Sequence, residues 1–64
     1  MITHCIICKK MPHEIGEYVQ LAKEWFITPE QFVAEEEGTY NKDNGHFYCT
    51  ECYIRIGMPN GVAP

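Results

Sequence analysis

Apolar side chains recur at helical spacing in the first half of the chain. Between residues 13 and 27 the apolar positions lie three or four residues apart, at Ile15, Tyr18, Val19, Ala22, Trp25 and Phe26. Such spacing places them on one face of a helix, so the pattern predicts a helix over about residues 14–26. Gly16 weakens its first turn. The run from Trp25 to Ile27 also fits a short strand, and this alternative stays open.

A second, shorter helix is predicted directly afterwards. Thr28 is a suitable N-cap, Pro29 suits the first helical position and Gln31 completes a capping box. Phe32 gives this helix an apolar side, and Gly38 indicates where it ends.

Three consecutive acidic residues stand at the end of the second helix: Glu35, Glu36 and Glu37. Negative charge at a helix C-terminus opposes the helix dipole. These glutamates are most simply a solvated face. A carboxylate metal site is the alternative, although nothing in the sequence places other ligands beside them.

The second half of the chain predicts a β-hairpin followed by a short helix. Two β-favouring stretches, residues 39–40 and 46–48, flank a loop that is rich in Asn, Asp and Gly. Asn44-Gly45 supplies the positive φ values that hairpin loops need. Thr50 is the expected N-cap of the final helix, and Gly57 is its expected end.

All four cysteines occur in two CxxC pairs, and these carry most of the chemistry in this sequence. The cysteines are Cys5, Cys8, Cys49 and Cys52. One tight turn presents both sulfurs of a CxxC pair to a single ion, and two such turns complete a tetrahedral zinc site. The sequence therefore predicts one structural zinc ion per chain. Two other readings stay open: a pair of disulfides, or a site in which one histidine replaces a sulfur, the choices being His4, His13 and His46.

Length and charge limit the class of protein. Sixty-four residues form one domain at most. The fold of a domain of this size is only marginally stable unless a bound metal ion or disulfides stabilise it. We expect a single zinc-binding domain over residues 1–59 and a flexible tail over 60–64. Residues 1–10 lack the apolar core of a secretory signal, and no apolar run approaches a membrane span. A cytoplasmic location without membrane contact is expected, which favours metal over disulfides.

The order of these features resembles the treble-clef zinc fold group. Cys5 and Cys8 match the knuckle, and residues 46–52 match the half in which a strand leads into a helix. The resemblance implies an α+β fold: a small zinc-stabilised domain with a β-hairpin, a helical insert over about residues 13–38 and a short C-terminal helix. Zinc ribbons are the structural alternative. Residues 3–8 and 47–52 are also similar to the paired knuckles of small sporulation anti-sigma proteins, which implies a zinc protein that binds another protein.

The sequence contains no pattern that indicates catalysis. Four thiolates close the zinc shell, whereas a catalytic zinc keeps one position open. The deaminase pattern H-x-E is missing, as are a P-loop and G-x-S-x-G. We therefore expect a non-enzymatic adaptor or regulator that acts through protein contacts. A nucleic-acid-binding finger is the alternative, disfavoured by the net charge of −4, and a small zinc enzyme ranks third. The finger would use Lys9, Lys10, Lys42 and Arg55.

The predicted partner surface lies in the helical insert. It combines three aromatic residues, Trp25, Phe26 and Phe32, with the three acidic residues Glu35, Glu36 and Glu37. An exposed aromatic would supply most of the affinity, and the carboxylates would orient a basic partner. The alternative is that these aromatics only cover the small core.

Overall fold

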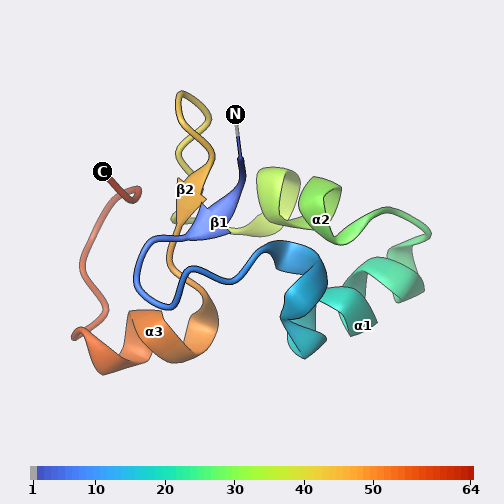
Figure 1. Cartoon of the computed structure of the whole chain (residues 1–64), viewed down its shortest axis with the longest axis horizontal. Coiled ribbons are helices and arrows are strands. Elements are labelled where there is room, and N and C mark those ends of the chain that lie inside the picture. The colour runs from blue at the N-terminus through green and yellow to red at the C-terminus, as the bar shows by residue number, and fades with distance from the viewer. Residues whose placement is uncertain (1) are drawn as a thin grey trace.

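A segment near the N-terminus and a segment from the second half of the chain pair in a short sheet in the computed structural model, which describes residues 2–64 (Figure 1). The elements in chain order are β1 (His4–Cys5), the 3₁₀ helix η1 (Pro12–Glu14), α1 (Gly16–Trp25), α2 (Pro29–Glu36), β2 (His46–Phe47) and α3 (Thr50–Arg55). Along the long axis of the molecule, α1 and α2 lie at one end and α3 at the other, with the sheet between them. This small α+β fold agrees with the predicted class.

Strands β1 and β2 pair in parallel, with His4 opposite His46 and Cys5 opposite Phe47. Side chains alternate between the two faces of a strand. Cys5 and Phe47 are fully buried, so this pair faces the core. The two histidines therefore lie on the opposite face. Strands of two residues are too short to hold the sheet together alone, so other contacts must keep these segments in place.

The predicted β-hairpin over residues 39–48 is wrong, because β2 takes its partner from the N-terminus rather than from residues 39–40. The loop nevertheless closes as hairpin loops do. Asn41 N–H donates to His46 O at 2.7 Å, and Gly45 N–H donates to Asn41 O at 2.7 Å. Gly45 has a φ of 78°, as the Asn-Gly motif predicts. The local turn was thus predicted correctly and the strand partner was not.

The two helices of the insert are confirmed. Residues 12–14 form η1, so α1 begins at Gly16, two residues later than predicted, and the strand alternative for residues 25–27 does not occur. Helix α2 begins as expected, because Thr28 Oγ1 accepts a hydrogen bond from Gln31 N–H at 3.0 Å and Pro29 is the first helical residue.

Helix α3 is also confirmed, but its start differs from the prediction. Cys49 occupies the N-cap position and Thr50 is the first helical residue. No side chain hydrogen-bonds to the helix start at this cap. The prediction that Thr50 caps the helix is therefore wrong. The end was predicted correctly, since the helix stops at Arg55 and Gly57 follows with a φ of 96°.

The core connects the helical insert to the cysteines. Tyr18 from α1, Val33 from α2 and Phe47 from β2 are buried together with three cysteines. The Tyr18 ring packs edge-on against Phe47, with centroids 5.8 Å apart, and against Phe32 at 5.9 Å. The insert is therefore anchored on the strand that leads into Cys49.

The last residues of the chain pack against the loop between α2 and β2. Ala63 is buried, its N–H donates to Thr39 O at 2.8 Å, and its carbonyl accepts from the Asn41 side chain at 2.9 Å. These contacts place residues 63–64 beside the loop. The flexibility predicted for residues 60–64 concerns motion and stays a prediction.

The two threonines at helix starts provide a matched test of this structure. We expect Thr28→Ala to lower the free energy of unfolding by about 1 kcal/mol, because it removes the Oγ1 acceptor that caps α2. Thr50→Ala should change it by less than about 0.5 kcal/mol, since Thr50 is exposed and caps nothing. Chemical denaturation of the zinc-loaded variants measures both. A larger loss for Thr50→Ala would contradict the assignment of Cys49 as N-cap.

Candidate metal centre

The first CxxC pair spans the end of β1, where Cys5 lies, and the tight turn that follows and carries Cys8. Lys9 N–H donates to Cys5 O at 2.9 Å, and Cys5 N–H donates to Lys10 O at 2.9 Å, which folds the turn back on itself. Lys9 has a φ of 68°. Glycine is the usual residue in this left-handed region, and the sequence has none here. The turn adopts the knuckle geometry despite the lysine.

The second CxxC pair is placed by α3. Cys49 immediately precedes the helix, and Cys52 lies in its first turn. The helix starts with Tyr53 N–H donating to Cys49 O at 2.8 Å. Both sulfurs therefore lie at the N-terminal end of α3, where the helix dipole and free N–H groups favour a thiolate.

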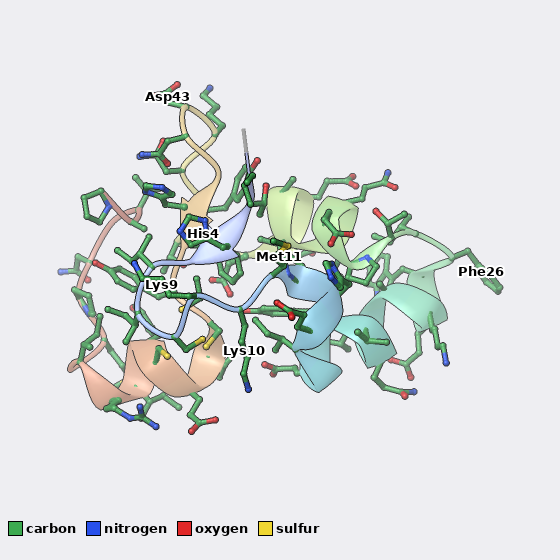
Figure 2. The ribbon with its side chains drawn as sticks, viewed as in Figure 1. His4, Lys9, Lys10, Met11, Phe26 and Asp43 are labelled. Carbon is green, nitrogen blue, oxygen red and sulfur yellow. The ribbon has the colours of Figure 1, made fainter. Side chains whose placement is uncertain are left out.

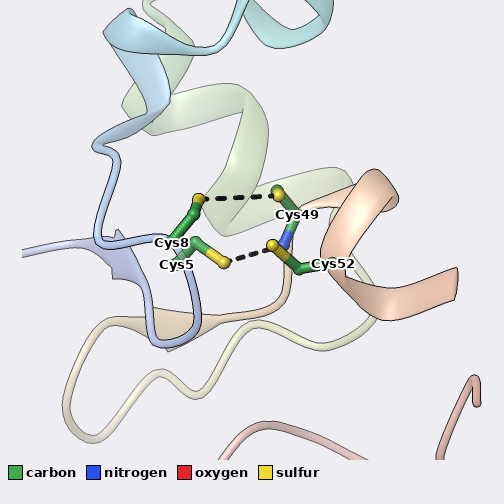
Figure 3. Close-up of side chains that lie close together, drawn as sticks. All are labelled: Cys5, Cys8, Cys49 and Cys52. Atoms are coloured by element: carbon green, nitrogen blue, oxygen red, sulfur yellow. Dashed lines mark hydrogen bonds between the residues drawn. The ribbon is translucent and has the colours of Figure 1, made fainter. Parts of the chain in front are cut away.

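The two pairs converge on one point (Figure 3). The four Sγ atoms all lie within 4.8 Å of one another, and Cys8 Sγ is 3.9 Å from Cys49 Sγ. A tetrahedral zinc with Zn–S bonds of about 2.3 Å separates its sulfurs by about 3.8 Å. The arrangement thus fits one zinc ion, and zinc is the most plausible metal for four thiolates.

The structure shows neither disulfides nor a histidine in place of one of the four sulfurs. All four cysteines are free thiols rather than disulfides. The only cluster of three or more metal-binding side chains found over residues 2–64 consists of these cysteines, so no histidine takes the place of a sulfur. Over the same residues, the three glutamates that end the insert form no carboxylate site with other ligands.

The ionisation of the four neighbouring thiols also favours a bound cation. Burial raises the pKa of Cys5, but hydrogen bonds from the backbone of Cys49, Cys8 and Ile7 outweigh it and bring this pKa down to about 7. Burial raises the pKa of Cys49 and of Cys52. One thiolate thus forms easily and its neighbours then resist ionisation, because like charges repel. A divalent cation at the centre removes this conflict and lets all four thiols ionise.

One side of the cluster faces solvent. Cys5, Cys49 and Cys52 are buried, whereas Cys8 is exposed. A cleft of about 310 Å³ opens beside the cluster, and both basic and acidic side chains line it, among them Lys10, Glu14, Glu51 and Arg55. Because charges of both signs line it, this cleft does not form a basic groove.

The residues of the predicted partner surface do not gather in one place. Trp25 and Phe26 are 61% and 95% exposed at the end of α1. Phe32 packs against the core instead. Glu35 and Glu36 are exposed, but they lie at the far end of α2, about 10 Å along the helix from its start beside Phe26. The structure therefore separates the exposed aromatics from the glutamates.

Glu37 takes part in the fold itself. Its carboxylate accepts a hydrogen bond from the Tyr18 hydroxyl at 2.5 Å and another from Thr39 N–H at 3.2 Å. Burial and this carboxylate together raise the pKa of Tyr18. The Thr39 hydroxyl oxygen in turn accepts a hydrogen bond from Tyr48 N–H at 2.9 Å. Glu37 thus connects α1 to the segment that follows α2.

The basic residues named for the nucleic-acid alternative are also dispersed. Lys9 and Lys10 lie on the knuckle (Figure 2). Lys42 lies in the loop before β2, next to Asp43 at its tip. Arg55 is paired with Glu51 at 2.9 Å on α3. The chain therefore presents no continuous basic stripe over the residues that the structure describes.

The relation between His4 and His46 was missed at the sequence level, where each was considered only as a substitute for a sulfur. The structure places them opposite one another across the sheet. The available signal was their position: His4 directly precedes the first CxxC pair, and His46 opens the short β-favouring stretch that leads into the second.

Searches against protein-family models, curated proteins and solved structures found no match for this chain. Over residues 2–64, no helix has both the length and the apolar character needed to cross a membrane.

We expect native mass spectrometry under reducing conditions to show one zinc ion per chain. Strong chelation, or Cys49→Ser, should abolish the near-UV circular dichroism and most of the helical signal, because the metal joins two segments far apart in sequence and metal binding supplies folding free energy. A chain that keeps its aromatic signals after the zinc is removed would show that the core of Tyr18, Val33 and Phe47 is sufficient.

The left-handed turn at Lys9 predicts a stabilising substitution. Lys9→Gly should raise the free energy of unfolding of the zinc-loaded protein by about 1 kcal/mol, because glycine adopts this φ without a Cβ clash. Lys10→Gly is the matched control, since Lys10 is also exposed but has no positive φ. Thermal denaturation compares the two. Equal effects of both changes would show that charge, rather than backbone strain, is responsible.

Proposed function

We propose that this chain is a non-catalytic zinc module that binds a partner protein, as an adaptor or regulator. Its zinc, held by Cys5, Cys8, Cys49 and Cys52, is structural. The four sulfurs at tetrahedral spacing, three of them from buried cysteines, support this role because they would fill the coordination shell. The helical insert, which the metal site does not need, carries the partner surface.

The observation that carries this proposal is the exposure of the Phe26 side chain together with its left-handed backbone. Its side chain is 95% exposed and points away from the molecule at the end opposite α3 (Figure 2). Phe26 also has a φ of 59°, in the left-handed position that ends α1. Ile27 N–H donates to Ala22 O at 3.0 Å, which completes a Schellman motif. Glycine is the usual residue at this position, so a bulky, solvated phenylalanine is unfavourable for the fold on two counts.

Backbone strain that the fold does not require is a reason to propose a function at that residue. Trp25, directly before Phe26, is 61% exposed. Two adjacent exposed aromatics at a protruding turn have the character of interface anchors, because aromatic side chains supply large contact area and dominate binding energies. The pair Trp25 and Phe26, here called the aromatic tip, is therefore the proposed contact site.

The charge distribution indicates the chemistry of the partner. Residues 13–38 contain seven of the nine acidic residues and only one of the five basic ones. The aromatic tip thus projects from an acidic body, while the knuckle and α3 hold most of the basic residues. A partner with a basic surface around an apolar pocket fits this pattern, since complementary charge speeds encounter and selects against acidic proteins.

A treble-clef-like arrangement is part of the same proposal. In its favour, the knuckle precedes a turn-and-strand segment, and the helix that follows carries the last two cysteines at its start. The loop over residues 41–46 stands where a treble clef has its hairpin. Binding of single-stranded nucleic acid remains the weaker alternative, because the aromatic tip has acidic rather than basic surroundings.

Phe26→Gly separates binding from folding. We expect it to raise the free energy of unfolding by about 1 kcal/mol, because it removes the strained left-handed phenylalanine. The same change should abolish capture of the partner when the zinc-loaded protein is used as bait in extracts of its host, followed by mass spectrometry. Ile54→Ala is the matched control, since Ile54 is 59% exposed but lies on α3.

Two outcomes would contradict the proposal. One is undiminished capture by Phe26→Gly, and the other is an equal loss of capture with Ile54→Ala. Captured material that is nucleic acid, and that is released by moderate salt, would favour the alternative function.

A further inference from the structure

A pair of histidines occupies the outer face of the two-stranded sheet, apart from the four-cysteine cluster. His4 and His46 are register partners across β1 and β2, and both are partly exposed. Their ring centroids are 5.0 Å apart and the ring planes are inclined by 72°. Figure 2 shows His4 beside the strands. Neither ring takes part in the core or in the cysteine cluster.

Each imidazole is held in the same tautomer. His4 Nδ1 lies 3.2 Å from Ile2 O, and His46 Nδ1 lies 2.8 Å from Pro64 O. Both of these oxygens can only accept a hydrogen bond, so Nδ1 of each ring must carry the proton. In the neutral form of each ring the lone pair is therefore on Nε2, and over residues 2–64 this atom makes no hydrogen bond to the protein. Histidines that bind metals use this arrangement, in which the second nitrogen donates to a carbonyl and orients the ring.

The spacing of the rings also suits a shared ion. Imidazole nitrogens bind zinc-like ions at about 2.0–2.1 Å, which puts each ring centroid about 3.2 Å from the metal. When the angle between the two metal–nitrogen bonds lies between the square-planar and the tetrahedral value, the two ring centroids are about 4.5–5.2 Å apart. The observed 5.0 Å lies within this range.

We propose that His4 and His46 form a second metal site, which binds a borderline divalent ion such as Ni²⁺, Cu²⁺ or a second Zn²⁺ through two imidazole nitrogens, with water completing the shell. Imidazole suits this class of ion, whereas Mg²⁺ and Ca²⁺ prefer oxygen ligands. The site differs from the cysteine cluster in lying on the outer face of the sheet, where both rings are partly exposed. An ion held here also links β1 to β2, the strands that lead into Cys5 and Cys49.

Ni²⁺ added to the zinc-loaded protein tests this site, because Ni²⁺ favours imidazole and spares the thiols from the oxidation that Cu²⁺ causes. Native mass spectrometry should show one zinc and one nickel per chain. In NMR spectra, paramagnetic Ni²⁺ should broaden the ring signals of His4 and His46 and leave those of His13 sharp. His13 is a suitable internal reference, because it is exposed on η1 and pairs with Glu30.

Two variants complete the test. His46→Ala should retain its zinc and weaken nickel binding by more than about tenfold, since loss of even an outer-shell partner of a metal costs 10–100-fold in affinity. His13→Ala should bind nickel as the unchanged protein does. Absence of a second metal in excess Ni²⁺, broadening centred on His13, or undiminished nickel binding by His46→Ala would each overturn the proposal. The spectra of the unchanged protein decide the case if His46→Ala fails to fold.

Discussion

The convergence of four sulfurs is the constraint on which the rest of this structure depends. The sheet offers only two residues in each strand, and the core contains few large side chains besides Tyr18, Val33 and Phe47. Such contacts do not offset the conformational entropy of 64 residues. The knuckle and the start of α3, separated by most of the chain, are brought within 3.9 Å at Cys8 and Cys49. A metal ion bound at this point would supply the missing free energy of folding.

The position of the metal centre also determines what the remaining surface can do. Residues at the knuckle and around the start of α3 are committed to building the site. The insert, by contrast, is fixed at one end only, where Tyr18 packs on Phe47 and bonds to Glu37. Its other end projects beyond the core and carries Trp25 and Phe26. Binding sites commonly lie on segments that a rigid scaffold positions but that do not themselves stabilise it.

The exposed phenylalanine and the knuckle lysine illustrate two different uses of left-handed backbone. Lys9 has positive φ because the knuckle turn demands it, and the neighbouring hydrogen bonds between Cys5 and residues 9–10 maintain it. Phe26 has positive φ because the end of α1 demands it, yet its side chain contributes almost no burial in return. The first is explained within the fold, whereas packing within the fold does not explain the second.

Local chemistry in the sequence was sufficient for the helices, the Asn-Gly turn and the choice of the four cysteines that cluster, since capping residues, helical periodicity and CxxC spacing act over a few residues. The strand partner of β2, the cap of α3, the separation of Phe32 from Trp25 and Phe26, and the pairing of His4 with His46 were decided only by the tertiary structure. Each depends on which distant segment occupies a given face. Strand pairing and burial join residues about forty positions apart, and no short-range pattern in the chain encodes that choice.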